Sequence, residues 1–327
     1  MNASSNKGGD KSASKFRILG FNANSIGTNP KRSKVLRYMN KKNPDFIIVS
    51  DSRICPNIEN IVREEWGGTC IFNSFSSQAR GIAILLKKGN LAVILNEFKD
   101  NAGNILAILI EYDGKKILLE GLYGPNQDCP DFYKNEVFKK IEEWEPTYSI
   151  FVGDWNVALN QNIDTKNYMQ DNNQQSRRAI QDKIDEHNLI DIYREFYPDS
   201  RIFTWQKFNQ NKFARLDYFL ILSSLAPYVQ NVSILPKFCS DHSPIILDID
   251  FTKFNRGRGF WKFNNSLLND KEYLGLIKNT IKRVCTQYAI INNDQNFYIN
   301  ATESELIEFL KNQTPESLQI LNFSTNP

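Results

Sequence analysis

The sequence predicts an α/β fold in which two mixed β-sheets pack face to face and helices lie outside them. Short apolar runs recur between residues 16 and 251, and each is bounded by Gly, Asn or Asp, which is typical of buried strands. Segments with helical spacing are fewer and lie between some of these runs. Strands that outnumber helices, some adjacent and some separated by a helix, favour mixed sheets covered by helices.

The expected strands share an apolar, β-branched composition. They are FRILGF (16–21), DFIIVS (45–50), GIAILLK (81–87), LAVIL (91–95), ILAILIEY (105–112), KILLEGLY (116–123), YSIFVGD (148–154), RLDYFLIL (215–222) and IILDIDF (245–251). The expected helices have apolar residues three and four positions apart. The first begins at Pro30, places Val35, Leu36 and Met39 on one face and stops before Pro44, and the others cover 131–144 and 174–190.

Composition narrows the possible classes of protein. The chain has 327 residues, of which 41% are hydrophobic, so it is long enough to bury a core. Its five cysteines form no CxxC pair and it has two histidines, so neither a disulfide framework nor a zinc site is indicated. No apolar run is long enough to cross a bilayer, and we expect no membrane contact. The net charge of +3 identifies no polyanionic partner.

The chain is expected to contain one main domain and a tail. Residues 1–15 lack the apolar core of a signal peptide and are expected to form a disordered leader, followed by the main domain at 16–251. Residues 252–269 are basic and rich in Gly and Asn, which is typical of a linker. In 270–327, Leu274, Ile277, Ile281 and Val284 share one helical stripe, which predicts a helical tail.

Polar residues follow or interrupt the expected strands, where catalytic groups of layered α/β folds tend to lie. For each one a turn or cap is the alternative interpretation. Asp217 lies among apolar neighbours, and a buried carboxylate needs a partner or a cation. The set consists of Asn22, Asn24, Asp51, Tyr123, Asn126, Asp154, Asn156, Asp217, Asp241 and His242.

This set is rich in carboxylate and amide oxygens and poor in thiol and imidazole. Hard oxygen ligands suit Mg²⁺, which usually takes one or two carboxylates, water and a substrate phosphate. The chemistry indicated is phosphoester hydrolysis. Carboxylates alone would repel a phosphodiester, so the metal, His242 and amide donors such as Asn156 are needed to offset the growing negative charge.

Seven short motifs then resemble the endonuclease/exonuclease/phosphatase superfamily in order and spacing. They are FNAN (21–24), SDS (50–52), YGPN (123–126), GDWN (153–156), FTW (203–205), RLDY (215–218) and SDHSP (240–244). Within the superfamily the chain looks most like the apurinic-endonuclease-like domain of LINE-type (non-LTR) retrotransposons. The resemblance implies a four-layered, DNase I-like α/β sandwich. GFWKFNNSLLND (259–270) resembles the segment that leads toward a reverse transcriptase, so we expect a truncated endonuclease portion.

The resemblance also implies a role for each matching residue. Asn22, Asp51 and Asp241 would belong to the metal site for Mg²⁺, with Mn²⁺ as an alternative. Tyr123 would contact the phosphate, Asp154 would orient or deprotonate the attacking water, and Asn156 would assist at the phosphate. Asp241 would also fix the tautomer of His242, which contacts the phosphate or acts as a base. Thr204 and Asp217 would support the scissile phosphate, and Asp217 would assist the leaving oxygen.

One position departs from the resembled pattern. The family usually has glutamate where this chain has Asp51. The missing methylene shortens the reach by about 1.5 Å, which is large beside Mg²⁺–ligand distances near 2.1 Å. A bridging water or a strand shift would compensate for the shorter side chain; otherwise activity would be lower.

DNA contacts are expected from the segment after Thr204. It interleaves Trp205, Phe208 and Phe213 with Lys207 and Lys212, a composition that suits stacking on bases and binding of phosphates. The alternative is a hairpin whose aromatic residues pack on its own strands. Arg177 is a further candidate phosphate contact.

The function implied is a Mg²⁺-dependent DNA endonuclease that nicks one strand and leaves a 3′-hydroxyl to prime reverse transcription. Its partners would be double-stranded DNA and, through downstream domains, the element RNA; we expect a monomer made in the cytoplasm that acts in the nucleus. Two alternatives remain open. One is another phosphodiesterase or phosphatase of the same fold, and the other is a decayed, non-catalytic DNA-binding fragment.

Overall fold

The computed structural model describes residues 15–252 together with Gly275, Lys278 and Asn279. The chain divides into two units, Met1–Asn255 and Arg256–Pro327. The expected leader, linker and tail therefore lie almost wholly outside the described residues. The exceptions are Lys15 of the leader, Thr252 of the linker, and Gly275, Lys278 and Asn279 of the tail.

The first sheet has six strands in the order β14-β15-β1-β2-β4-β3. The pair β1–β2 is parallel and the other pairs are antiparallel, so the sheet is mixed as predicted. The strands are β1 (Lys15–Asn22), β2 (Phe46–Ser50), β3 (Thr69–Asn73), β4 (Ile82–Leu86), β14 (Val229–Ile234) and β15 (Ile245–Asp250).

The second sheet also has six strands, in the order β10-β13-β8-β7-β6-β5. Here β7–β8 is the parallel pair. The strands are β5 (Val93–Lys99), β6 (Ile105–Tyr112), β7 (Lys115–Tyr123), β8 (Tyr148–Asp154), β10 (Leu189–Asp191) and β13 (Asp217–Leu222).

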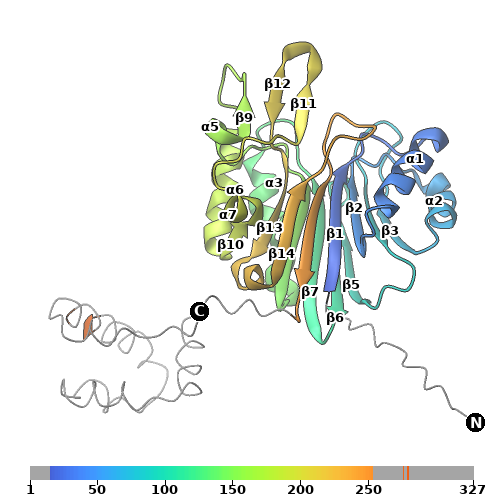
Figure 1. Cartoon of the computed structure of the whole chain (residues 1–327), viewed down its shortest axis with the longest axis horizontal. Coiled ribbons are helices and arrows are strands. Elements are labelled where there is room, and N and C mark those ends of the chain that lie inside the picture. Colours follow the sequence, from blue (N-terminus) through green and yellow to red (C-terminus); the bar gives the residue numbers. More distant parts are fainter. Residues whose placement is uncertain (1–14, 253–274, 276–277, 280–327) are drawn as a thin grey trace, which may run out of the picture. The chain divides into compact units, whose positions relative to one another are not determined.

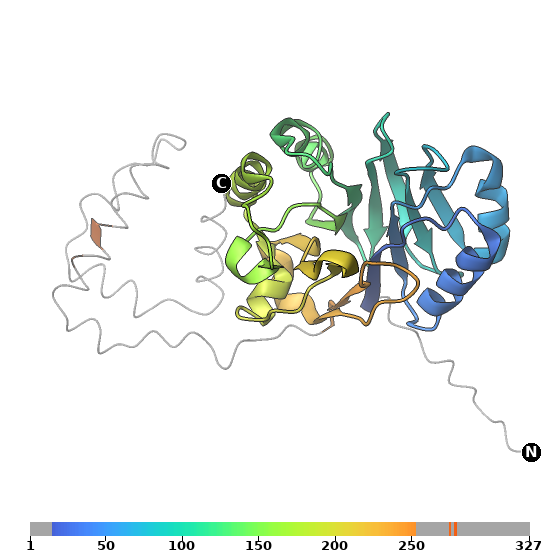
Figure 2. The same cartoon turned by 90° about the horizontal axis from the view of Figure 1, so that it is seen from above.

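Alternate residues of both sheets build the core between them. On the inner faces, residues such as Ile18, Ile48, Ile108 and Ile150 belong to one buried cluster. Successive side chains of a strand point to opposite faces, so their neighbours pack outward against helices. Figure 2 shows one group of helices beside each sheet, α1 (Asn29–Asn40) and α2 (Glu59–Trp66) on one side and α3 (Pro130–Asn135), α4 (Lys139–Trp144) and α6 (Gln174–Glu186) on the other. These layers confirm the predicted fold class.

The helices follow the predicted patterns with two differences. In α1, Pro30 occupies the first turn and Val35, Leu36 and Met39 are buried. The segment predicted as one helix over 131–144 forms α3 and α4, because the chain breaks at Val137 and Phe138 and turns both side chains into the core. The segment predicted as a helix over 174–190 forms α6 only as far as Glu186, and its last two residues belong to the strand β10. No described helix is long and apolar enough to span a bilayer.

A small third sheet stands beyond one end of the two large ones. It has the order β11-β12-β9, with β9 (Thr165–Lys166), β11 (Trp205–Lys207) and β12 (Lys212–Ala214). Figure 1 shows these strands projecting above the main body. The remaining short helices are α5 (Gln161–Asp164) and α7 (Ile192–Phe196), with 3-10 segments at Pro56–Ile58, Phe208–Gln210 and Ser223–Tyr228.

The two parallel pairs decide where polar side chains gather. Asn22 pairs with Ser50 at the ends of β1 and β2, and Tyr123 pairs with Asp154 at the ends of β7 and β8. Parallel strands finish at the same edge of a sheet, and in layered α/β folds ligands bind beyond this edge. The fold therefore brings together motifs that are far apart in the sequence.

Candidate active site

A cavity of about 600 Å³ opens at this edge. Its wall is mostly polar, with side chains from both large sheets and from the third sheet. Of the residues singled out from the sequence, it collects Asn22, Asn24, Asp51, Tyr123, Asn126, Asp154, Asn156, Arg177, Trp205, Asp241 and His242.

Two carboxylates flank His242, which lines the cavity together with Asp154; Asp217 is not one of the lining residues. Nδ1 of His242 lies 2.7 Å from Oδ2 of Asp217, and Nε2 lies 3.6 Å from Oδ2 of Asp154. All three residues are at most 5% exposed. They come together because β8 and β13 pair antiparallel with Asp154 opposite Asp217. The carboxylate that holds the histidine is therefore Asp217, and the expected pairing with Asp241 is wrong.

The protonation of these groups follows from burial and charge. Burial raises the pKa of Asp154 to about 7, and the negative charge of Asp217 adds to this effect. Burial lowers the pKa of His242, but the charges of Asp217 and Asp154 outweigh it and raise the pKa to about 9. Near neutral pH the site thus holds an imidazolium beside a carboxylate that is close to its own titration point.

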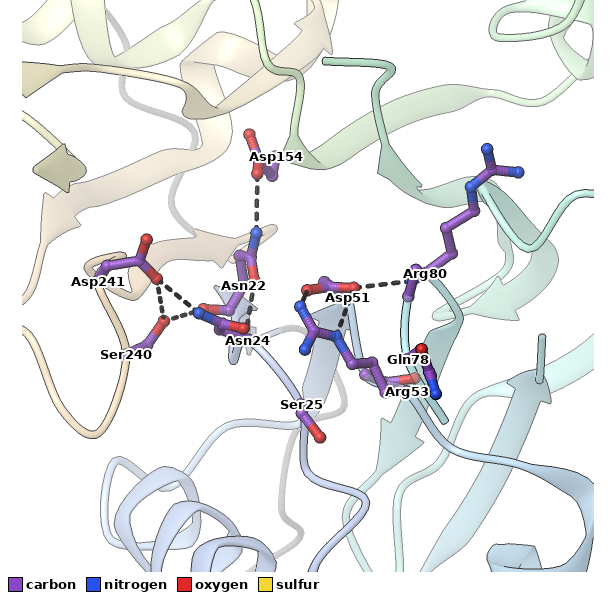
Figure 3. Close-up of polar contacts among 12 residues, drawn as sticks. Asn22, Asn24, Ser25, Asp51, Arg53, Gln78, Arg80, Asp154, Ser240 and Asp241 are labelled. Atoms are coloured by element: carbon purple, nitrogen blue, oxygen red, sulfur yellow. Dashed lines mark hydrogen bonds and ion pairs between the residues drawn. The ribbon is translucent and has the colours of Figure 1, made fainter. Parts of the chain in front are cut away.

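Two amide N–H groups hold Asp154 in place, and Figure 3 shows the one from the side chain of Asn22. Nδ2 of Asn22 donates to Oδ2 of Asp154 at 2.8 Å, and the backbone N–H of Asn156 donates to Oδ1 at 3.0 Å. The Asn22 amide oxygen accepts from the backbone of Asn24 at 2.9 Å. Asn22 therefore orients Asp154 and turns its oxygen away from it. The side chain of Asn156 donates to the carbonyl of Gly124 at 2.7 Å.

Asp241 lies on the cavity wall. It accepts from Nε1 of Trp205 and from Nδ2 of Asn24, both at 3.1 Å. Burial raises its pKa, but the charge of His242 and these hydrogen bonds outweigh burial and hold the pKa below the ordinary value. Asp241 is therefore an ionised carboxylate facing the cavity.

Asp51 directly follows β2 and lines the same cavity. It is 3% exposed and has a positive φ of 45°. Its carboxylate accepts from Nη2 of Arg53 at 2.7 Å and from the backbone N–H of Arg80 at 2.8 Å. Figure 3 shows Asp51 between Asn22 and Arg80.

These donors fit a hard divalent cation. Asp51 and Asp241 present carboxylates to one cavity, as Mg²⁺ requires. In addition, Oδ1 of Asp217 is buried and has no hydrogen-bond partner among the described residues. A buried anionic oxygen without a partner is costly unless a cation or a proton accompanies it.

Tyr123 and Asn126 complete the wall beyond Asp154. Burial raises the pKa of Tyr123 to about 12, and the charges of Asp154 and Asp51 add to the effect. The hydroxyl therefore stays protonated over the working pH range. It can donate a hydrogen bond to an anion in the cavity, as expected for a phosphate contact.

The expected nucleic-acid contacts divide into several groups. Thr204 is wrong as a DNA contact, because it is 0% exposed and its Oγ1 accepts from the backbone N–H groups of Leu216 and Asp217. Arg177 lines the cavity, but it is bound to Asp171, Gln161 and two backbone carbonyls. Trp205 lines the cavity. Lys207 is exposed, and Lys212 is half-buried with its ammonium over the ring of Tyr168. The side chain of Phe208 is not described.

Sequence reasoning missed Arg53, Tyr168 and Arg215. Arg53 follows Asp51 by two positions and faces the same cavity, so SDSR rather than SDS was the informative stretch. Tyr168 lies on the connection after β9, which has no motif. Arg215 is inside the RLDY motif and is fully buried.

The chain is similar to known proteins both in sequence and in structure. The chain is 23% identical over 257 residues to the transposon TX1 uncharacterized 149 kDa protein of Xenopus laevis. The match covers 76% of this chain and 19% of that protein, so the chain spans about a fifth of the length of its curated relative. No protein-family profile matches the chain.

Solved structures show the fold. The AP endonuclease LMAP of Leishmania major superposes with a TM-score of 0.61 at 18% identity, covering 73% of this chain and 88% of that one. An AP endonuclease of Archaeoglobus fulgidus gives 0.59 at 18% identity, covering 72% and 99%. The 3′ phosphatase NExo of Neisseria, solved with a product DNA hairpin, gives 0.57 at 18% identity, covering 72% and 99%. The chain has the DNase I-like fold of these nucleases, which confirms the fold that the motifs implied.

Proposed function

We propose that the chain is a metal-dependent endonuclease of a LINE-type element that nicks double-stranded DNA and leaves a 3′-hydroxyl primer. The observation that carries the proposal is the buried Asp154–His242–Asp217 group beside an oxygen-rich cavity. The similarity to a transposon protein and the nuclease fold support it. On this proposal the protein acts in the nucleus on chromosomal DNA.

Asp51 and Asp241 would hold the metal, with Mg²⁺ as the expected ion and Mn²⁺ as the alternative. When bound, such an ion stabilises negative charge on the phosphate and the leaving oxygen. Asp51, Asp241 and Asp154 line the same cavity, so a bound phosphate would meet the metal and Asp154 together.

The chain's own groups supply the remaining chemistry. Asp154 is held by Asn22 and by the backbone of Asn156, and it would orient a water molecule and accept its proton. His242, charged and held by Asp217, would donate to a non-bridging phosphate oxygen as negative charge grows there. The protonated hydroxyl of Tyr123 would donate to the same phosphate.

Conversion of supercoiled plasmid to open circles tests the proposal. We expect nicking with Mg²⁺ or Mn²⁺. We expect none when a chelator removes the metal, because the negative charge of the phosphate is then left unopposed. A small phosphoester and a 3′-phosphorylated oligonucleotide serve as comparison substrates. Absence of nicking at every metal concentration would overturn the endonuclease, and preference for the small phosphoester would favour another phosphodiesterase of this fold.

The rate of nicking is expected to have a bell-shaped pH dependence. Asp154 must be ionised to accept a proton, so the rate should rise as the pH passes about 7. His242 must be charged, so the rate should fall as the pH passes about 9. Single-turnover rates between pH 5.5 and 10 measure both limbs. In His242→Gln the upper limb should disappear, and a wild-type profile without either limb would contradict the assigned roles.

The strand β12 and its neighbours are expected to contact the DNA backbone. Lys207→Ala and Lys212→Ala should each weaken binding to all sequences and reduce the slope of log affinity against log salt by about 1. Fluorescence anisotropy with catalytically inactive protein measures this. Lys116, exposed at the opposite end of β7, is the control, and Lys116→Ala should change neither quantity. Equal effects of all three substitutions would show only a general charge effect.

A further inference from the structure

Arg53 places its guanidinium on Asp51, one of the two carboxylates of the proposed metal site. Its Nη2 lies 2.7 Å from Oδ2 of Asp51 and its Nε lies 3.3 Å from Oδ1. Both carboxylate oxygens of Asp51 are therefore engaged by one guanidinium group (Figure 3). The Arg53 side chain is 29% exposed and that of Asp51 is 4% exposed, so water screens this ion pair only in part.

The backbone holds this pair in position. The N–H of Ser52 donates to the carbonyl of Gly81, and the N–H of Arg53 donates to the carbonyl of Arg80, both at 2.9 Å. The N–H of Arg80 in turn donates to Asp51 at 2.8 Å. Asp51 and Arg53 both have positive φ, at 45° and 51°, which aims the two side chains at each other from positions two apart. The pair is thus built by the loop and does not depend on a flexible surface contact.

A guanidinium and a divalent cation cannot share Asp51 without cost. A cation would bind the same oxygens at about 2.1 Å, and it would stand within a few ångströms of another positive charge. Asp51 also has one methylene fewer than glutamate, so its carboxylate has less reach with which to leave the guanidinium and meet a cation. Asp241, the other candidate ligand, already contributes to the charge that stabilises Arg53 in its ionised form.

We propose that Arg53 is an internal cation that competes with the divalent metal for Asp51 and so weakens metal binding. This inference rests on the proposed function, because it takes Asp51 as a metal ligand. It follows that metal binding displaces the guanidinium, which then lies free in the cavity beside Tyr123. The metal-free protein is stabilised by the ion pair, and the metal-bound protein gains a mobile positive group near the substrate.

Direct titration with Mn²⁺ tests the competition without reference to catalysis. The free Mn²⁺ signal in electron paramagnetic resonance gives the dissociation constant for wild type, Arg53→Met and Arg53→Lys. Arg53→Met keeps the length of the side chain and removes the charge, so Mn²⁺ should bind at least about fivefold more tightly, a change of roughly 1 kcal/mol. Arg53→Lys should fall between the two. Thermal unfolding should show a lower melting temperature for metal-free Arg53→Met and a larger rise with Mn²⁺ than in wild type.

Arg80→Gln is the matched control. Its side chain donates to the carbonyl of Ala102 and lies over the ring of Phe75, while only its backbone contacts Asp51. Removal of this charge should change Mn²⁺ affinity much less than Arg53→Met does. Unchanged or weaker binding by Arg53→Met, or an equal gain from Arg80→Gln, would overturn the proposal, as would absence of Mn²⁺ binding to every variant. Plasmid nicking fails or succeeds separately, so loss of the proposed function is distinguishable from loss of the competition.

Discussion

Replacement of Asp154 by asparagine is expected to lower the rate of plasmid nicking by about 10²–10⁴-fold, the usual contribution of a positioned general base. The protein should not lose stability. Asparagine keeps the shape and retains an acceptor for Asn22 or for the backbone of Asn156. Burial raises the pKa of Asp154 to about 7, so above this pH the folded state carries a charge that burial disfavours. A neutral side chain removes that cost, and the melting temperature should stay the same or rise.

Single-turnover nicking and thermal unfolding at pH 8 measure the two effects together. Asp182→Asn, a change of the same kind at an exposed position of α6, is the control and should alter neither. Loss of activity with intact folding would assign Asp154 to the chemistry. An active Asp154→Asn protein, or a variant inactive only because it has unfolded, would contradict its role as the base.

Replacement of Arg215 by methionine is expected to cost about 3–5 kcal/mol of folding free energy, as for other buried charge networks that lose one partner. Nε of Arg215 lies 2.7 Å from Asp164, and Nη2 lies 2.5 Å from Asp191. Arg215 and Asp164 are both 0% exposed. Methionine fills much of the same volume, so the loss comes from the carboxylates: the fully buried Asp164 keeps only Arg194 as a cation, and the half-buried Asp191 loses its ion-pair partner.

Urea unfolding measures the free energy, and the melting temperature should fall by roughly 10 °C for a domain of this size. Asp191→Asn in the Arg215→Met background should recover part of the loss, because it removes one unpaired charge. Arg178→Ala, at an exposed position of α6, should change stability by no more than about 0.5 kcal/mol. A loss no greater than that of Arg178→Ala would show that Arg215 is not needed for the fold.

The same network links stability to the third sheet. Asp164 ends α5 directly before β9, and Arg215 directly follows β12, so the pair ties these two strands together and, through Asp191, to β10. Burial raises the pKa of Asp164, but the charge of Arg215 outweighs it and holds the pKa below the ordinary value of 3.8. Its contribution to stability is therefore present above pH 3.8 and is lost as the pH falls through the folded-state pKa.

Much of the fold was predictable because the central strands carry continuous apolar runs. Every expected run from 16–21 to 245–251 contains or overlaps a strand of the two large sheets. The strands β3, β14 and β10 were not predicted, and all three lie at sheet edges. An edge strand has one neighbour and a shorter apolar run, so pairing with that neighbour, rather than its own composition, decides its limits. For the same reason β5 covers Val93–Lys99 instead of 91–95.

The members of the site were predictable, but their pairing was not. Neighbouring strand ends bring together motifs from Asn22 to His242. Asp241 and His242 adjoin in the sequence, which suggested a pair. Successive side chains of extended backbone point to opposite sides, so His242 meets Asp217 of β13 while Asp241 meets Trp205 and Asn24. Thr204 and Arg53 were misjudged or missed because burial and positive φ cannot be read from residue type.

The proposed cleavage of DNA to leave a 3′-hydroxyl is tested most directly by identifying the chemical group at the cut end. Supercoiled plasmid is incubated with the protein and Mg²⁺, and the product is then offered to a DNA polymerase with labelled nucleotides. The proposed hydrolysis predicts open circles that take up label, because it leaves a 3′-hydroxyl, and far fewer circles and far less label with the Asp154→Asn protein over the same time. Plasmid that stays supercoiled, or nicked circles that cannot be extended, would contradict it.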